Sequence, residues 1–364
     1  MRKSIVVAAI ICAFLWVGSA SAQTDAKPLE WKMPSTWTPA INLIEADRYF
    51  AKKVNELSGG RFKITVSGAG ELVPAMQVFD AVSKGSFPIG ADWPGYWSGK
   101  NTAFDILGTY PMGLCQYDYV NWYYHYGGKA LYNEMYGKFN MVSFMHASTP
   151  MESGIRTVVP IKSLADYKGK KLRISGKAPG HMLKKLGASQ VMLAGGEIYQ
   201  ALQMKTIDGA EFNSDSCDWG MGFAEVTKYN IGPGWHQPCS TLTIMINKDA
   251  WAKLPDDLKK IVEISAEASC SYISSWFEVE NIAAIEKFKK AGTQIFTLPN
   301  EDLKVLEQYS WEYMVDESKR NPDFGKVALS QMQYLKNFQV TRQKQSPFGH
   351  GRNPFTLPDL PGLK

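Results

Sequence analysis

The hydrophobic and polar positions after Leu29 follow two alternating periods and predict strand, helix, strand, helix and strand in that order. Leu29, Trp31 and Met33 alternate with charged residues, which is typical of a strand. Apolar residues then recur every three or four positions until two glycines end the helical pattern. The second helix begins at Pro74, a residue that favours the first helical turn. The five elements cover residues 29–33, 41–57, 61–66, 74–84 and 88–92.

A later segment repeats this order of elements. A strand is predicted at Lys171 to Ser175, and a helix follows that Gly187 closes. The five elements cover residues 171–175, 179–186, 190–193, 196–204 and 207–212. Two similar α/β units in one chain predict an α/β fold of two lobes with a ligand cleft between them.

The last third of the chain has mostly helical periodicity. A strand at 241–247 precedes a long helical pattern that Pro255 opens and Gly292 closes. At 1.5 Å per residue this helix would be roughly 50 Å long, wider than one lobe, so we expect it to span both. Two further helices are predicted at 302–320 and 324–341, followed by a tail rich in proline and glycine.

The first residues indicate export. Arg2 and Lys3 precede an uncharged apolar stretch, and Ala20-Ser21-Ala22 offers a cleavage site before Gln23. The alternative, a membrane-spanning helix, needs about 20 apolar residues. Cys12 lacks the small residues that precede a lipid-modified cysteine. We therefore expect a soluble periplasmic protein whose signal peptide, residues 1–22, is removed.

Composition narrows the function further. Removing Arg2 and Lys3 would lower the formal charge from +5 to +3, and the basic residues are scattered, which argues against nucleic acid binding. Four cysteines would remain, and their pairing cannot be chosen from the sequence. They stand at positions 115, 217, 239 and 270. Their wide spacing argues against metal binding through thiolates.

Patterns typical of enzymes are missing from the sequence. It contains no nucleophile elbow, phosphate-binding loop, pair of histidines on one helical turn or CxxC. The five histidines are dispersed, and each is interpreted as a surface or core residue. They are His125, His146, His181, His236 and His350.

Three motifs carry a family resemblance. They read KSLADYKGKKLR at 162–173, GEIYQALQ at 196–203 and IDGAE at 207–211. The sequence resembles the solute-binding receptors of tripartite ATP-independent periplasmic (TRAP) transporters. MESG at 151–154 and GWHQP at 234–238 are most similar to the branch that binds 2-oxo and 2-hydroxy monocarboxylates with a metal ion.

The resemblance implies a two-lobed periplasmic binding protein, type II-like, that delivers a small organic acid to membrane subunits and is not an enzyme. We assign residues 23–149 plus about 240–270 to lobe I, and 150–239 plus about 271–320 to lobe II. Residues 321–364 form a C-terminal helix and tail. The lobes would close around the ligand by a hinge motion.

Arg173 matches the arginine that is characteristic of the family. Guanidinium is always charged, and its planar fork fits a carboxylate with two hydrogen bonds. The alternative is a structural salt bridge with Asp166 or Glu197. Its position at the end of a predicted strand favours the ligand.

The resemblance also implies an ion site formed by Glu152, Glu211, Phe212 and Gln237. Oxygen ligands favour a hard cation. Two glutamates and a ligand carboxylate against one arginine favour calcium over sodium. Relatives have glutamine at the first position and tryptophan at the third, so Glu152 and Phe212 are departures. Alternatively, each glutamate is an ordinary solvated acid.

Residues at or after predicted strand ends are expected to form the cleft walls. They are Trp37, Tyr96, Trp97, Phe212 and Asn213. The hydroxyl of Tyr96 is the best candidate for a polar contact with a carboxylate. The aromatic cluster at 117–126 is interpreted as core. The ligand's side chain, aromatic or aliphatic, stays open.

Two other functions and the assembly state remain as alternatives. A secreted enzyme would use Glu152 and Glu211 as an acid–base pair. A receptor of an ABC importer would differ only in its membrane partner. The helix at 324–341 carries more apolar residues than a free tail needs, so a homodimer through this helix is the alternative to a monomer.

Overall fold

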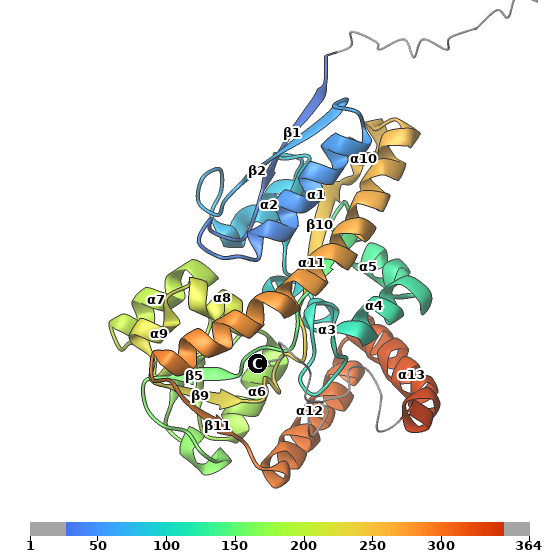
Figure 1. The fold of residues 1–364 in the computed structure, drawn as a ribbon. Coiled ribbons are helices and arrows are strands. Elements are labelled where there is room, and N and C mark those ends of the chain that lie inside the picture. Colours follow the sequence, from blue (N-terminus) through green and yellow to red (C-terminus); the bar gives the residue numbers. More distant parts are fainter. Residues whose placement is uncertain (1–26, 346–364) are drawn as a thin grey trace, which may run out of the picture.

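The computed structural model describes residues 27–345 and confirms a mixed α/β fold (Figure 1). The expected signal peptide and the tail after residue 345 lie outside the described residues. The strands are β1 (Leu29–Pro34), β2 (Phe62–Ser67), β3 (Ile89–Asp92), β4 (Met141–Ser148), β5 (Ile155–Thr157), β6 (Lys171–Arg173), β7 (Ser189–Val191), β8 (Gly209–Ala210), β9 (Tyr229–Gly232), β10 (Thr241–Asn247) and β11 (Gln294–Thr297).

The helices fill the spaces around these strands. They are α1 (Ile44–Leu57), α2 (Val78–Ser83), α3 (Ala103–Gly108), α4 (Gln116–His125), α5 (Gly128–Gly137), α6 (Lys177–Lys185), α7 (Gly195–Gln203), α8 (Asp215–Gly220), α9 (Phe223–Val226), α10 (Lys248–Lys253), α11 (Asp256–Lys290), α12 (Asn300–Arg320) and α13 (Pro322–Gln345). Short 3-10 turns form η1 (Ala75–Gln77), η2 (Pro94–Trp97) and η3 (Leu164–Tyr167).

One half of the molecule is built on β1 to β4 and β10. β1 and β2 pair in parallel, and β10 pairs antiparallel with both β3 and β4. An isolated bridge between Ser35 and Ala91 joins the two sheets. The alternation predicted for β1 holds only in part, because Met33 is buried and Trp31 half-buried, whereas Leu29 is exposed.

The other half is a six-stranded sheet in the order β11-β9-β5-β8-β6-β7. Its strands are short; β8 contains only Gly209 and Ala210. The predicted strand at 207–212 was therefore too long, because Glu211 and Phe212 leave the ladder and enter the space between the two halves. Ile155, Leu172 and Ile231 pack beneath this sheet against α6 and α12.

Helix α11 confirms the long helix expected from the sequence. It has 35 residues, packs on α1 and β4 near its start and contacts α8 further along, so it joins the two halves (Figure 1). Its buried residues recur at helical spacing, for example Val262, Ala266, Ile273 and Phe277. Within residues 27–345, no helix is long and apolar enough to cross a bilayer.

The last helix, α13, packs on α3, α4, α5 and α12 of its own chain. Phe324, Val327 and Tyr334 are buried there, whereas Leu329 and Val340 are exposed. Most of the apolar positions that suggested a dimer therefore have partners within this chain. The homodimer stays a prediction.

The structure also refines the expectations for the aromatic cluster and for the cysteines. In the aromatic cluster at 117–126, Tyr119, Trp122 and Tyr123 are core residues as predicted, but Tyr117 and Tyr126 are exposed. The thiols whose pairing was left open, at positions 115, 217, 239 and 270, are all free in the structure.

Candidate functional site

The topology of the six-stranded sheet gathers the expected site residues at one edge. β6 runs parallel to β8 with Arg173 opposite Ala210, so Glu211 emerges beside Arg173. β5 runs antiparallel to β8, and the Ser153 N–H donates to the Asn213 carbonyl. Glu152 therefore reaches the same edge from the opposite direction.

The Arg173 guanidinium is buried and largely satisfied by protein groups. Its Nη1 donates to the Oε1 of Glu211 at 2.8 Å and to the Glu211 carbonyl at 2.9 Å. Its Nε and Nη2 donate to the Leu193 carbonyl at 3.2 and 3.0 Å. These bonds use four of the five N–H groups and leave one on Nη2. The Arg173 carbon Cζ also lies 5.4 Å from the centre of the Phe212 ring.

The salt-bridge partner of Arg173 differs from the one considered from the sequence. Asp166 instead accepts from the backbone of Lys162 and Ser163, and Glu197 accepts from the Ala194 N–H. The alternative that named these two acids was wrong, because both serve as local turn and helix caps.

Glu152, Glu211 and His236 form a buried cluster whose nearest ligand atoms all lie within 4.8 Å of one another. His236 Nε2 lies 2.9 Å from the Oε2 of Glu152. The Gln237 amide nitrogen donates to the Oε2 of Glu211 at 3.4 Å, and Ser240 Oγ donates to the Gln237 amide oxygen at 2.7 Å. Both glutamates are buried, so interpreting them as solvated surface acids was wrong.

His236 was missed as a member of this cluster. The sequence interpretation placed it with the other dispersed histidines. The available signal was its position inside the motif 234–238, which was used only to find Gln237.

The cluster carries an unfavourable concentration of negative charge. Burial, followed by the neighbouring carboxylate of Glu211, raises the pKa of Glu152 well above its usual range. Burial lowers the pKa of His236 to about 4, so its ring is neutral near pH 7. Two buried carboxylates and a neutral imidazole around one point are suitable ligands for a cation, and the Gln237 amide lies beside them with its nitrogen toward Glu211. The residues present therefore fit a bound metal ion.

A small cavity lies between this cluster and a wall of aromatic residues. The volume of the cavity is about 20 Å³. That volume is close to the room that one or two waters need. The lining residues are Trp37, Leu43, Trp93, Tyr96, Arg173, Ser175, Phe212, Asn213, Gln237, Ser240 and Leu242.

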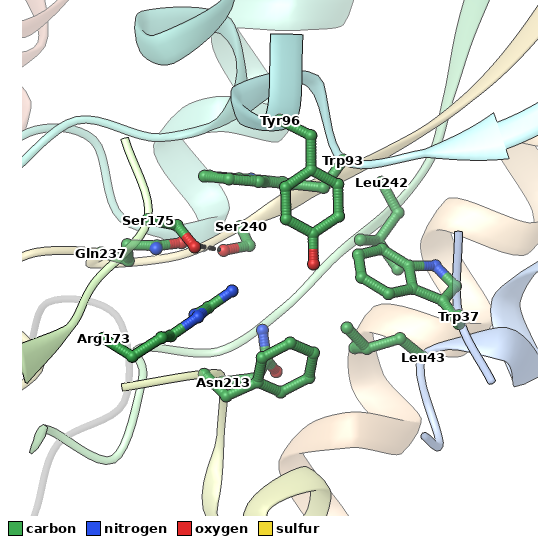
Figure 2. Close-up of a pocket in the computed structure, with 11 residues that line it drawn as sticks. Trp37, Leu43, Trp93, Tyr96, Arg173, Ser175, Asn213, Gln237, Ser240 and Leu242 are labelled. Atoms are coloured by element: carbon green, nitrogen blue, oxygen red, sulfur yellow. Dashed lines mark hydrogen bonds between the residues drawn. The ribbon is translucent and has the colours of Figure 1, made fainter. Parts of the chain in front are cut away.

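Hydrogen-bond donors converge on this cavity. Figure 2 shows the Arg173 guanidinium, the Tyr96 hydroxyl and the side-chain nitrogen of Asn213 pointing toward a common space. Burial raises the pKa of Tyr96 to about 12, so its hydroxyl keeps its proton at neutral pH. Three donors facing one space are suited to an anion.

The structure also changes the expected aromatic lining. Trp97 does not line the cavity, because its indole nitrogen donates to Asp92 in the interior. Trp93, which follows β3 directly, lines the cavity instead. Leu43, Ser175, Ser240 and Leu242 were missed, because aliphatic and serine residues carry no distinctive sequence signal.

Comparisons with known proteins place the chain in a family. Residues 35–318 match the model of the DctP family, described as bacterial extracellular solute-binding protein, family 7. A monocarboxylate 2-oxoacid-binding periplasmic protein of Nostoc sp. is 30% identical over 309 residues, 85% of each chain.

Two solved structures are similar in fold and sequence. A TRAP solute-binding protein from Bordetella bronchiseptica has a TM-score of 0.84 at 28% identity, covering 89% of this chain and 97% of that one, and holds calcium and picolinate. One from Pseudoalteromonas atlantica has a TM-score of 0.83 at 29% identity, covering 87% and 97%, and holds sodium and pyruvate.

Family members are periplasmic receptors that bind small solutes and work with membrane subunits, and they are not enzymes. The use of Glu152 and Glu211 as a catalytic pair is thereby set aside. The match over residues 35–318, together with the similarity over most of the chain to the Nostoc, Bordetella and Pseudoalteromonas proteins, identifies this protein as a member of the DctP family of TRAP solute-binding receptors.

Proposed function

We propose that this receptor captures a small 2-oxo or 2-hydroxy monocarboxylate in the cavity between Arg173 and Tyr96. The observation that carries the proposal is the convergence of the Arg173, Tyr96 and Asn213 donors on a small buried space beside the Glu152–Glu211 cluster. The Nostoc, Bordetella and Pseudoalteromonas relatives support it, because their ligands are 2-oxo acids or picolinate, a monocarboxylate with a ring nitrogen next to the carbon that carries the carboxylate.

Arg173 would hold the carboxylate through its remaining Nη2–H, while Tyr96 and Asn213 donate to the same oxygens. Sequence reasoning expected a two-pronged contact from Arg173 alone. In the structure Glu211 occupies Nη1, so the carboxylate would be shared among three side chains. Trp37 and Phe212 would flank the ligand's remaining atoms, with their ring centres 6.3 Å apart.

A metal ion would be held by Glu152, Glu211 and Gln237, with the main-chain carbonyl of Phe212 as an adjoining ligand, and the 2-oxygen and carboxylate of the organic acid would chelate it. Calcium is proposed over sodium on the balance of charge. With an ion bound, Glu152 would give up the proton that burial favours, so two glutamates and the ligand would bring three negative charges, Arg173 brings one positive, and His236 is neutral. A divalent ion neutralises the sum, whereas sodium leaves one charge in a buried site.

Delivery requires export, opening and a membrane partner. We propose that residues 1–22 direct the chain to the periplasm and are removed. We also propose that lobe I (23–149 and about 240–270) and lobe II (150–239 and about 271–320) open by a hinge motion to exchange ligand. TRAP membrane subunits, rather than an ABC importer, would receive it.

The test is calorimetry of the purified receptor with pyruvate, lactate and picolinate, with and without calcium. We expect one site per chain, tighter binding with calcium, and ligand recovered unchanged. Exhaustive chelation should weaken binding, and calcium should restore it better than sodium. Binding that survives chelation in sodium-free buffer would refute the ion. Failure of all three acids to bind would refute the ligand class.

A further inference from the structure

Asp105 makes a contact between two parts of the chain that carry different sides of the ligand site. It lies in α3, and its buried Oδ2 accepts a hydrogen bond from the backbone N–H of Lys177 at 2.8 Å. Lys177 is the first residue of α6. Asp105 therefore acts as the N-terminal cap of a helix 72 positions further along the chain.

Helix α6 has no cap of its own. Its N-cap residue is Gly176, and no side chain from the preceding loop bonds the first turn. Gly176 has φ +88°, and a Cβ there would lie 3.1 Å from the Oδ1 of Asp105. Glycine thus allows both the backbone conformation and the close approach of the carboxylate. The backbone at Gly176 therefore leaves room for the Asp105 carboxylate beside the first turn of α6.

The two segments joined by this bond each carry a ligand-facing donor. Helix α3 packs against η2, the turn that contains Tyr96. Helix α6 begins four residues after Arg173, and the Ser175 N–H between them donates to Glu211, the partner of Arg173. The Asp105–Lys177 bond is therefore a direct contact between the Tyr96 side and the Arg173 side of the cavity, in addition to the packing of α12 on α6 and of α13 on α3.

The contact makes both a favourable and an unfavourable contribution to closure. A carboxylate at a helix N-terminus gains from both the hydrogen bond and the positive end of the helix dipole. Its other oxygen, Oδ1, is buried without a hydrogen-bond partner. Opening the two sides would let water hydrate Oδ1, which favours the open form. While the site is closed, the bond to Lys177 and the packing around it must offset this lost hydration.

We propose that Asp105 is a positioning residue that holds the ligand site closed by capping α6 from the opposite side of the cavity. This inference rests on the proposed function only in its use of ligand affinity as a readout. Asp105 touches no ligand. Its loss would speed ligand release and shift the ligand-free protein toward open forms, whereas a merely structural cap would lower stability alone.

The experiment compares Asp105→Ala and Asp105→Asn with Asp208→Asn. Asp208 is the matched control, because it accepts from the Lys171 N–H at 2.8 Å, at the other end of the Arg173 strand and away from α3. Pyruvate affinity is measured by calorimetry with calcium, release by stopped-flow tryptophan fluorescence, and the ligand-free radius of gyration by X-ray scattering.

We expect Asp105→Ala to bind about 5- to 30-fold more weakly, mainly through faster release, with a larger ligand-free radius of gyration. Asp105→Asn keeps an accepting oxygen, so its pyruvate affinity should lie between those of Asp105→Ala and wild type. It replaces the alanine variant in the experiment if that variant does not fold. Asp208→Asn should match wild type.

Unchanged release and an unchanged radius in both Asp105 variants would overturn the inference, even if pyruvate binds. If wild type binds none of the acids, the proposed function fails. Scattering of the ligand-free variants still decides the role of Asp105.

Discussion

The two walls of the cavity are built from different chemistry. The aromatic wall, formed by Trp37, Leu43, Trp93, Tyr96 and Leu242, offers shape and one hydroxyl group. In the charged wall, Arg173 and Gln237 line the cavity and both hydrogen-bond Glu211, while Glu152 and its partner His236 lie in the cluster behind them. A change in the charged wall removes a ligand contact and leaves a buried partner unpaired, whereas a change in the aromatic wall removes little beyond its own contact. The charged wall should therefore show the larger effects.

Arg173→Lys should give the largest loss, at least about tenfold in affinity for pyruvate, while the protein still folds. Lysine keeps the charge but not the planar set of N–H groups that meets Glu211, Leu193 and the cavity. A charge-assisted hydrogen bond contributes roughly 1.5–3 kcal/mol, which corresponds to about tenfold or more. Calorimetry measures the effect.

Arg156→Lys is the matched control for this prediction. Arg156 is a buried arginine in β5 that pairs with Asp215 and Asp218, each at 2.6 Å, and does not line the cavity. It should lower thermal stability without a comparable loss of affinity. Wild-type affinity in Arg173→Lys would remove Arg173 from the ligand site.

In Glu211→Gln, the factor by which calcium tightens pyruvate binding should be about tenfold smaller than in wild type. The amide keeps the size of the side chain but removes one of the two buried negative charges that face each other in the cluster. The measurement is pyruvate affinity as a function of free calcium. Glu197→Gln, at the exposed cap of α7, is the control and should behave as wild type. An unaltered calcium dependence in Glu211→Gln would exclude Glu211 as an ion ligand.

Tyr96→Phe should cost less, about two- to tenfold in affinity. It removes one neutral hydroxyl donor, typically about 0.5–1.5 kcal/mol, and keeps the ring that packs on Trp37 and Trp93. Tyr199→Phe, whose exposed hydroxyl bonds Glu225, should have no effect on binding. A loss as large as that of Arg173→Lys would contradict the proposed difference between the two walls.

Periodic elements were predictable from the sequence, whereas the short strands of the site were not. α11 and β10 lie where spacing placed them, because many positions contribute to each pattern. β5 and β8 have three and two residues, too few to show alternation, and their positions depend on neighbours distant in the chain. The expected helix at 74–84 is divided into η1, which has no buried residue, and α2, whose Val78, Phe79 and Val82 are buried.

The site itself was predicted by motif position and not by geometry. The resemblance located Arg173, Glu211 and Gln237, and the structure places them together. The sequence does not reveal that Glu211, rather than Asp166 or Glu197, faces Arg173, because this depends on β6 lying beside β8. His236 was missed for the same reason: its proximity to Glu152 arises only when the segment after β9 folds back.

The two walls also differ in how they support buried acids. Behind the charged wall, Asp218 bonds Arg156 Nε at 2.6 Å, and burial still raises the pKa of Asp218 to about 6. Behind the aromatic wall, Asp92 anchors η2 through neutral donors only, the Trp97 indole and the Tyr136 hydroxyl. Burial raises the pKa of Asp92 to about 7. The aromatic wall therefore depends on an acid that has no cation to balance it.

Asp92→Asn should have a small effect on affinity but should change how stability depends on pH. The pKa of Asp92 rises from an ordinary value of 3.8 to about 7 on folding, so the folded protein binds the extra proton between these values. Its contribution to stability is full below pH 4 and is lost as the pH rises toward 7, at up to about 1.4 kcal/mol per pH unit. Asparagine resembles the protonated acid and does not titrate. Relative to this variant, the free energy of unfolding of wild type should therefore fall by roughly 1 kcal/mol or more between pH 4.5 and 7 in denaturant unfolding experiments.

Asp166→Asn is the control of opposite sign, because backbone donors lower the pKa of that exposed acid. A constant difference between wild type and Asp92→Asn across this range would mean that Asp92 stays ionised, and the aromatic wall would then tolerate a buried charge as the charged wall does.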